Sequence, residues 1–495
     1  MTPCQPHGCY WQKNINTHQM YYKIFKEINA IPHPSHHEEA MADYLCRFAE
    51  AHNLSWQRDK ANCVAIRKPA SPGYEDHEPV VILNHMDMVC VSDGSRRYDP
   101  QHDGIRPLIY DENGECWMRA DGTSLGADNG IGLSMALAIL ADNTLQHPPL
   151  EVLTTTNEED GMSGAAQLSE DFITGRRVLN LDSEAYDEIT IGAAGATIQV
   201  AQLPYRKIKM PENYAACTVT VSGGQGGHSG VDIARGRANA IKILANLLLV
   251  AIRQCDIKLY LVSFEGGTAA AAIPGEATAK IVLPKDKMEA FDTLVTQCDE
   301  AIEHQFAESD ADVRIDCEPS VWHSTIVSEE STHLLLAAIN GIPVGPTEMI
   351  DADTPMTSNN IGVVRQTPQH FEVSMHTRSF SDEKMQQLAS QLRKIFEVTG
   401  ASVRLVMKAP SWKEDPDDPL IALTSQTFRD VLGFEPKQVS MHFVLEAGYL
   451  VEKYPGLHIA SIGPRILEPH SVNERVQLST VDKIWKVVIE MLRRM

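Results

Sequence analysis

The sequence has no apolar run long enough to cross a membrane, which takes about 20 residues. Its most apolar stretch, residues 244–252, is much too short. The N-terminal stretch before residue 20 carries polar side chains and prolines, and it lacks the apolar core of a signal peptide. We therefore expect no contact with a membrane and a cytoplasmic location.

Basic side chains are also scarce. The 43 lysines and arginines are outnumbered by 66 aspartates and glutamates, which gives a net charge of −23. A nucleic-acid-binding protein needs a basic surface, and docking on an anionic membrane needs basic clusters. The charge balance therefore opposes both kinds of partner, and we interpret it as a contribution to solubility.

None of the ten cysteines belongs to a Cys-x-x-Cys pair. In a chain of this length an even number of cysteines is not evidence for a disulfide framework, so we expect reduced thiols. Cys4, His7 and Cys9 are residue types that bind metals, but their place in the polar N-terminal stretch favours a frayed tail.

The length of the chain predicts two or three domains. In the first part, predicted strands alternate with helices, and this alternation indicates an α/β fold with a mostly parallel sheet sandwiched by helices. The strands are predicted at 80–83, 150–156 and 177–181, and a helix that is apolar on nearly every side is predicted at 131–141.

Near the N-terminus, Ser35 and Glu38 have the spacing of a capping box. In such a box, two side chains satisfy the first free N–H groups of a helix. The spacing therefore predicts a capped helix that continues to about residue 51.

The character of the sequence changes after about residue 203. An alternating strand at 216–222 and a helix at 234–252 indicate an α+β domain, and the α/β pattern returns from about residue 408. We therefore predict an α/β domain in two pieces with an α+β domain inserted between them. The predicted ranges are 1–203, 204–404 and 405–495.

Polar residues follow directly after the predicted strands of the α/β domain. Strand ends in open α/β sheets are where ligands bind, because the carboxyl ends of parallel strands meet at one edge. This shared placement predicts one site. Its members are His85, Asp87, Glu158, Glu159 and Asp182.

One histidine and several carboxylates are typical ligands of divalent ions such as zinc. A pair of ions needs a bridging carboxylate, and Asp128 fits because it lies in a tight turn that opens the buried helix. In the Glu158-Glu159 pair, one carboxylate can bind metal while the other takes a proton from water.

Each residue also has a simpler interpretation. Asp128 can be a turn residue, the Glu158-Glu159 pair a solvated one, Asp182 a helix cap and His470 a loop histidine. Their clustering at element ends of one domain favours the common site.

The ordered motifs resemble those of the co-catalytic zinc metallopeptidases of the aminoacylase and carboxypeptidase G type. Within that family the chain is most similar to the aminoacyl-histidine dipeptidases, also called beta-alanyl-histidine or cytosol nonspecific dipeptidases. The similarity spans nearly the whole chain apart from the N-terminal tail. The motifs are His85-x-Asp87, Gly126-Ala127-Asp128-Asn129-Gly130, Glu158-Glu159, Asp182, Gly227-His228-Ser229-Gly230 and Pro469-His470-Ser471.

The resemblance implies a zinc-peptidase-like sheet with a lid domain, and a metalloprotease that hydrolyses dipeptides, Xaa-His such as carnosine among them. It implies two divalent ions, Zn²⁺ in the first place, with Mn²⁺ or Co²⁺ as substitutes. One ion is expected on His85, Asp128 and Asp182, and the other on Asp128, Glu159 and His470.

The resemblance also implies roles for the remaining site residues. Asp87 is expected to orient His85, and Glu158 to act as general base and then as acid. In the lid, His228 is expected to polarise the oxyanion and Arg378 to bind the substrate's terminal carboxylate. The peptide bond after Asp128 is cis in this family. The simpler interpretation of His228 and Arg378 is that they are surface residues of the lid.

The chain departs from the family pattern at two places. Ala271 stands where an asparagine is expected to touch the substrate, and Phe443 and Val444 stand where smaller residues are usual. Substrate preference therefore stays open, and an N-acyl amino acid deacylase and a catalytically inactive binding homologue are the alternatives to a dipeptidase. The expected partner is a small peptide, and the expected assembly is a monomer or a homodimer.

Overall fold

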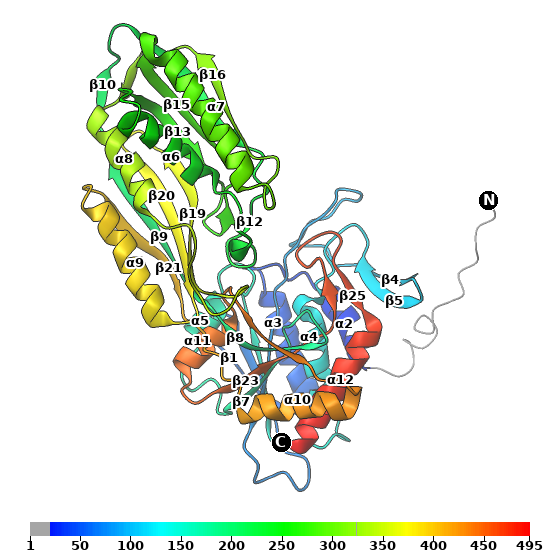
Figure 1. Cartoon of the computed structure of the whole chain (residues 1–495). Helices are drawn as coiled ribbons and strands as arrows, with labels where there is room; N and C mark the ends of the chain where they lie inside the picture. The colour runs from blue at the N-terminus through cyan, green and yellow to red at the C-terminus, as the bar shows by residue number, and fades with distance from the viewer. Residues whose placement is uncertain (1–19, 323) are drawn as a thin grey trace, which may run out of the picture. The chain divides into compact units, whose positions relative to one another are not determined.

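The computed structural model describes residues 20–322 and 324–495 (Figure 1). The stretch with Cys4, His7 and Cys9 lies outside them. The chain forms two compact units. The first contains the described residues up to Gly192, together with Glu414–Ser440 and Glu446–Met495, and the second contains Ala193–Lys413 and Met441–Leu445.

The first unit is built on an eight-stranded sheet. Its four central strands are parallel, whereas β1, β2 and β8 pair antiparallel, so the expected mostly parallel sheet is parallel only at its centre. The strands in spatial order are β1 (Ser55–Arg58), β2 (Val64–Lys68), β6 (Leu150–Thr155), β3 (Val80–His85), β7 (Arg177–Asn180), β23 (His458–Ser461), β8 (Glu188–Ala193) and β22 (Lys437–Met441).

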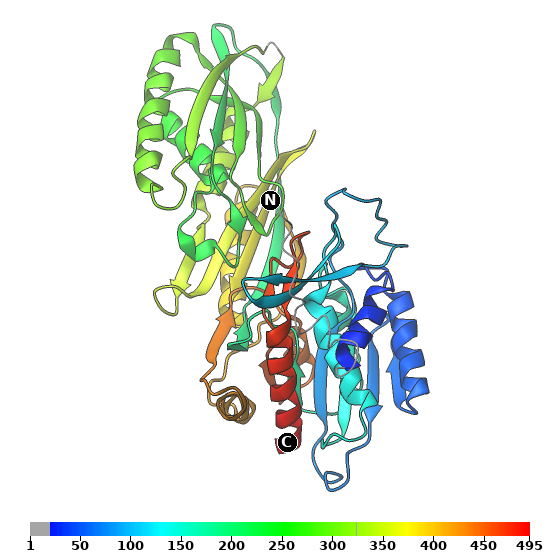
Figure 2. The ribbon, with the colours of Figure 1, turned by 90° about the vertical axis from the view of Figure 1, so that its right-hand side faces the viewer.

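Helices enclose this sheet in one apolar core. Every residue of β3 and β6 is buried, as expected for strands covered on both faces. The chain ends in α12, the red helix of Figures 1 and 2, which packs against α10. The helices are α2 (Met20–Asn29), α3 (Glu39–Ala51), α4 (Ala127–Ala141), α5 (Ser163–Gln167), α10 (Pro419–Leu432), α11 (Glu446–Lys453) and α12 (Leu478–Arg494).

A smaller four-stranded sheet completes the first unit. It joins a hairpin from the first part of the chain to two short strands near the C-terminus, so segments far apart in sequence lie side by side. Its order is β24 (Ile466–Leu467), β25 (Arg475–Gln477), β5 (Glu115–Ala120) and β4 (Pro107–Glu112).

The second unit is built on a nine-stranded sheet whose described pairings are all antiparallel. The expected inserted segment, 204–404, lies within this unit, which also includes β9 and β21 at its ends. The strands are β16 (Arg314–Ser320), β11 (Tyr214–Ser222), β15 (Ala277–Pro284), β13 (Tyr260–Gly266), β19 (Pro355–Gln366), β20 (His370–Ser379), β9 (Gly195–Pro204) and β21 (Ser402–Ala409), with β18 (Gly345–Met349) on β19.

Four long helices pack on this sheet. Helix α7 packs along β16, at the upper end of Figure 1. The helices are α6 (Ala240–Arg253), α7 (Met288–Gln305), α8 (Glu329–Gly341) and α9 (Asp382–Glu397). Short pairs add β10 (Lys207–Lys209) with β17 (Thr325–Val327), and β12 (Gly227–His228) with β14 (Ala272–Ile273).

Helix starts differ from the sequence-based expectation. Helix α4 begins at Ala127 and not at residue 131. The helix expected from residue 234 begins at Ala240, because the side chain of Asn239 accepts a hydrogen bond from the N–H of Lys242 and caps it there. The prediction of a capping box at Ser35 and Glu38 is wrong. Helix α3 has no side-chain cap, and the Ser35 hydroxyl donates to Asp87 instead.

No described helix is long and apolar enough to span a membrane. Cys116 is disulfide-bonded, so the expectation of reduced thiols is wrong at that residue. The seven other described cysteines are free: Cys46, Cys63, Cys90, Cys217, Cys255, Cys298 and Cys317.

Helix α4 packs so closely on the loop after β7 that one position excludes any side chain. A Cβ atom on Gly132 would lie 2.0 Å from Oδ1 of Asn129 and 2.5 Å from the carbonyl oxygen of Leu181. We expect Gly132→Ala to lower the free energy of unfolding by about 1–3 kcal/mol, because backbone and helix must separate. Chemical denaturation measures the loss. The matched variant Gly341→Ala, whose Cβ would meet only Ile395 at 3.6 Å, should show none, and equal losses would contradict the close-packing argument.

Candidate metal centre

The carboxyl ends of three central strands bring the predicted residues to one edge of the sheet. β3 ends at His85, which pairs with Thr155, the last residue of β6. β7 ends at Asn180, two residues before Asp182. Because the strands are parallel and in register, the residues that follow them lie together.

These side chains surround two adjacent points. The Nε2 atom of His85 lies 3.1 Å from Oδ1 of Asp128 and 3.3 Å from Oδ1 of Asp182. On the other side, Nε2 of His470 lies 3.1 Å from Oδ2 of Asp128 and 2.9 Å from Oε2 of Glu159. Asp128 therefore offers one carboxylate oxygen to each histidine, which is the geometry of a bridging ligand.

Asp87 contacts the site in a way that its spacing from His85 did not predict. The main-chain carbonyl of Asp87, and not its carboxylate, accepts from Nδ1 of His85 at 3.0 Å. The Asp87 carboxylate lies 3.7 Å from that nitrogen. It accepts instead from the backbone N–H groups of Glu158 and Glu159 and from the Ser35 hydroxyl. Asp87 thus holds the loop after β6 against the end of β3.

The turn that presents Asp128 is held by a residue that the sequence analysis missed. Glu474, which is only 2 % exposed, accepts from the backbone N–H groups of Leu125, Gly126, Ala127 and Asp128 at 2.7 to 3.4 Å. No local pattern identifies Glu474, because its partners are main-chain groups hundreds of residues away. The peptide bond between Asp128 and Asn129 is cis.

Burial and mutual repulsion perturb the carboxylates of the site. Burial and neighbouring negative charges raise the pKa of Glu158 well above its usual range, and they raise the pKa of Glu184 and of Glu446 to about 8. Burial also raises the pKa of Asp182 to about 6. So many carboxylates in one buried place strongly favour a bound cation.

The two histidines respond in the opposite direction. Burial opposes the charged form of His85, but Asp182, Asp128 and Asp87 raise its pKa well above the usual range. Hydrogen bonds to Asp128 and Glu159 raise the pKa of His470 to about 11. A divalent cation can take the place of these protons, since imidazole nitrogen and carboxylate oxygen are its usual ligands.

Three groups of the described residues are close enough to hold a metal, with all ligand atoms of a group within 4.8 Å of one another. They are His85-Asp128-Asp182, Asp128-Glu159-His470 and His85-Glu158-Glu159. The buried Oε1 of Glu159 has no hydrogen-bond partner, and a cation would satisfy it. The donor set therefore fits divalent metal ions.

The other two predicted residues belong to the second unit and lie against each other there. Nη2 of Arg378 is 3.2 Å from Nε2 of His228. Arg378 is 4 % exposed, and in the described part of the chain no carboxylate pairs with it. Burial lowers its pKa to about 10, while partial desolvation and Arg378 lower that of His228 to about 4.

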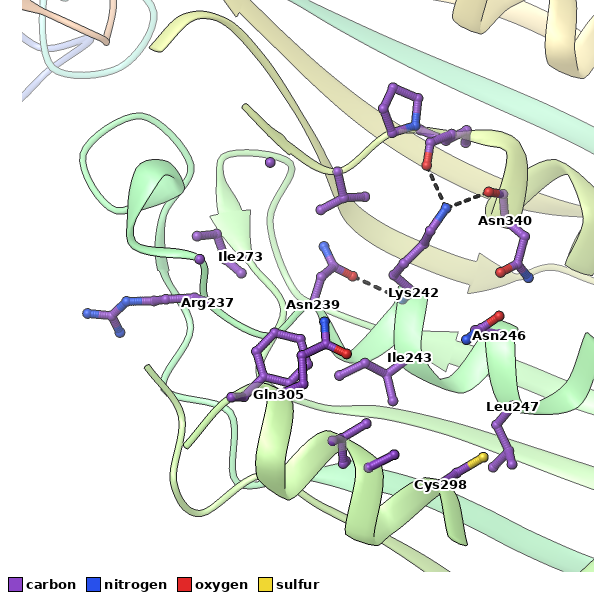
Figure 3. A pocket seen from close by; sticks show the side chains of 18 of the residues that line it. Arg237, Asn239, Lys242, Ile243, Asn246, Leu247, Ile273, Cys298, Gln305 and Asn340 are labelled. Carbon is purple, nitrogen blue, oxygen red and sulfur yellow. Dashed lines mark hydrogen bonds between the residues drawn. The ribbon is translucent and has the colours of Figure 1, made fainter. Parts of the chain in front are cut away.

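A cavity of about 800 Å³ also lies in the second unit, beside α6 and α7 (Figure 3). Lys242 lines the cavity, and all three donors of its ammonium group have partners. Nζ donates to the carbonyl oxygens of Ile339, Asn340 and Ile342. None of the predicted site residues lines this cavity. The two predicted site residues of the second unit, Arg378 and His228, lie together away from this cavity's lining.

Known proteins resemble this chain over nearly its whole length. Residues 81–494 match Peptidase family M20/M25/M40. The chain is 34% identical over 477 residues to the cytosol non-specific dipeptidase of Escherichia coli (strain K12), which covers 96% of this chain and 97% of that protein.

Solved structures also resemble this chain over nearly its whole length. The aminoacylhistidine dipeptidase from Vibrio alginolyticus superposes with a TM-score of 0.86 and 33% identity, over 96% of both chains. The aminopeptidase PepT from Bacillus cereus shares the fold, with a TM-score of 0.55 and 16% identity over 96% of this chain and 97% of the other.

Replacing His85 and replacing Asp87 should affect metal binding differently. His85→Ala removes a ligand atom, and we expect it to lose one metal position. Asp87→Asn leaves all ligand atoms in place and should weaken binding about 10- to 100-fold, as loss of an orienting group does. Metal content after dialysis, measured by plasma mass spectrometry, distinguishes the two. Equal metal loss in both variants would contradict this division of roles between ligand and orienting group.

Glu474→Gln should weaken metal binding by at least about tenfold, because an amide offers one acceptor oxygen where the turn before Asp128 presents four N–H groups. Calorimetric titration with zinc measures the change. Glu490→Gln, which alters a partly buried carboxylate bonded to Arg493 and Arg494, is the matched control and should bind as the unmodified chain does. Unchanged affinity in Glu474→Gln would mean that the turn holds its shape without this carboxylate.

Proposed function

The chain belongs to peptidase family M20/M25/M40, and from this premise we propose how its residues carry out the metal-dependent hydrolysis of dipeptides. The observation that carries the proposal is the shared carboxylate of Asp128, with one oxygen 3.1 Å from His85 and the other 3.1 Å from His470. A carboxylate between two histidine-containing ligand groups suits a pair of ions.

We propose Zn²⁺ as the native metal at both positions, with Mn²⁺ and Co²⁺ as substitutes. His85, Asp128 and Asp182 would hold one ion, and Asp128, Glu159 and His470 the other. When bound, such a pair lowers the pKa of water and polarises the carbonyl of the scissile bond.

Glu158 is the general base of the proposed mechanism. Its backbone is fixed by Asp87, yet in the described structure its carboxylate accepts no hydrogen bond and is not tied to a partner. Burial raises its pKa above the usual range, which makes its carboxylate a stronger base. Glu158 would take the proton from the attacking water and then give it to the amine that leaves.

His228 and Arg378 would bind the substrate from the second unit. Arg378 is a buried guanidinium that no carboxylate of the described residues pairs with, and its Nε atom has no hydrogen-bond partner among them. A substrate carboxylate would satisfy it. His228 is uncharged at neutral pH because its pKa is about 4. The ring of Phe443 lies 6.2 Å from that of His228, nearly perpendicular to it, and Phe443 thereby forms part of the surroundings that differ from the family pattern.

The substrates of this enzyme are small peptides. We propose that it acts on them in the cytoplasm, as the name of its E. coli relative indicates for that protein, and that it works as a monomer or a homodimer.

Dipeptide hydrolysis by the zinc-loaded protein tests the proposal. We expect cleavage of unblocked dipeptides and none of N-acetyl amino acids. Glu158→Gln should lower kcat by about 10²- to 10⁴-fold, the usual contribution of a general base, while its metal content stays unchanged. Glu170→Gln, which alters an exposed glutamate of the same unit, should keep full activity.

Two results would overturn the proposal. Cleavage of the acetylated substrates alone would identify a deacylase. Metal-loaded protein that binds dipeptides without turnover that depends on Glu158 would identify a binding homologue.

A further inference from the structure

Besides His228, two histidines that the proposed mechanism does not use lie near Arg378. They are His376 and His442. Nε2 of His442 lies 2.8 Å from the Ser358 hydroxyl, and Ser358 pairs directly with Arg378 across β19 and β20. The cluster thus joins one buried guanidinium to three imidazoles within the second unit.

His376 is the member without a partner. It is 3 % exposed, and neither of its ring nitrogens has a hydrogen bond of good geometry. It precedes Arg378 by two residues on β20, so both side chains leave the same face of the strand. A buried polar group without a partner is costly and needs an explanation.

The strands beside His376 cannot supply that partner. Across β19 it pairs with Asn360, whose amide already donates to the carbonyls of Ala270 and Ala272 and accepts from Asn239. Across β9 it pairs with Ile198, which is apolar. The Ala270 carbonyl lies near the ring and favours its charged form, but in the described structure it makes no hydrogen bond of good geometry with it. The imidazole is therefore left for a group that is not part of the chain.

The charge around His376 limits what that group can be. Burial, Arg378 and His228 lower the pKa of His376 well below its usual range, although the Ala270 carbonyl opposes the shift. At neutral pH the ring is uncharged, with one N–H donor and one acceptor nitrogen. Arg378 is the only positive charge of the cluster, and the α-carboxylate of a bound dipeptide would neutralise it. A second carboxylate beside it would remain unpaired.

We propose that His376 hydrogen-bonds the side chain of the substrate's carboxyl-terminal residue and selects dipeptides in which that side chain is neutral and can both donate and accept, as an amide or a hydroxyl does. This inference rests on the proposed function, because it assumes that Arg378 holds the α-carboxylate. A site built to hydrogen-bond a substrate group rejects the analogue that lacks it, since its own buried group is then left unpaired.

Pairs of dipeptides with the same shape test the selection. For the unmodified enzyme we expect kcat/KM to be about ten- to a hundredfold higher for Ala-Asn than for Ala-Leu, and higher for Ala-Thr than for Ala-Val. Ala-Asp should be cleaved less well than Ala-Asn. In His376→Leu, the ratio of Ala-Asn to Ala-Leu should fall at least tenfold, while Ala-Leu is still hydrolysed.

Two further variants separate recognition from damage to the fold. His376→Gln keeps a donor and an acceptor and should retain most of the preference for Ala-Asn. His370→Leu, at the start of the same strand, removes a histidine bonded to Glu372 and should leave the ratio unchanged. Selectivity that is equal in the unmodified enzyme, His376→Leu and His370→Leu, with hydrolysis intact, overturns the inference and leaves the proposed function standing.

Binding measured without turnover keeps the inference testable if no dipeptide is cleaved. In Glu158→Gln, calorimetric titration should show Ala-Asn binding more tightly than Ala-Leu, and the added His376→Leu change should remove the difference. Equal affinities for the two dipeptides before that change would overturn the inference. Absence of hydrolysis with retained selective binding would overturn the proposed function alone.

Discussion

The repulsion among buried carboxylates at one edge of the sheet is the constraint on which the first unit depends. Asp128, Glu158, Glu159 and Asp182 converge there, and burial raises the pKa of three of them. Such a cluster is stable only if cations or hydrogen-bond donors compensate it. His85 and His470 give part of that compensation, and bound divalent ions would give the rest. The arrangement therefore lowers the free energy of unfolding, and bound metal would raise it.

Backbone N–H groups compensate two further buried carboxylates beside the site. Asp87 and Glu474 are both almost fully buried carboxylates, and each binds main-chain N–H groups of a segment that carries site residues. Asp87 fixes the segment of Glu158 and Glu159, and Glu474 fixes the turn of Asp128. The positions of the metal ligands are thus set by contacts between side chain and main chain. This explains why additional acids stand beside an already acidic site.

Sequence patterns anticipated the parts that follow local rules. Apolar strands followed by polar residues indicated that His85, Glu158, Glu159 and Asp182 lie together, because parallel strands share one carboxyl edge. Contacts between distant segments escaped prediction. Ser35 has the spacing of a helix cap but bonds Asp87, and Glu474 lies in no motif. The sequence does not identify His376 either. Its lack of a partner becomes evident only in the structure, where the neighbouring Asn360 already has other hydrogen-bond partners.

The two units differ in the kind of chemistry that their side chains support. The first concentrates negative charge and suits metal ions and proton transfer. In the second, no described carboxylate pairs with the Arg378 guanidinium, and the histidines around it are uncharged. Such surroundings suit the recognition of an anion and of neutral polar groups. Arg378 and His376 belong to the second unit, and all the predicted metal ligands belong to the first. A change at Arg378 or His376 therefore leaves every ligand atom of the metal centre in the chain. Under the proposed roles, the first unit sets reactivity and the second sets selectivity, and the departures at Ala271 and Phe443 both lie in the second unit.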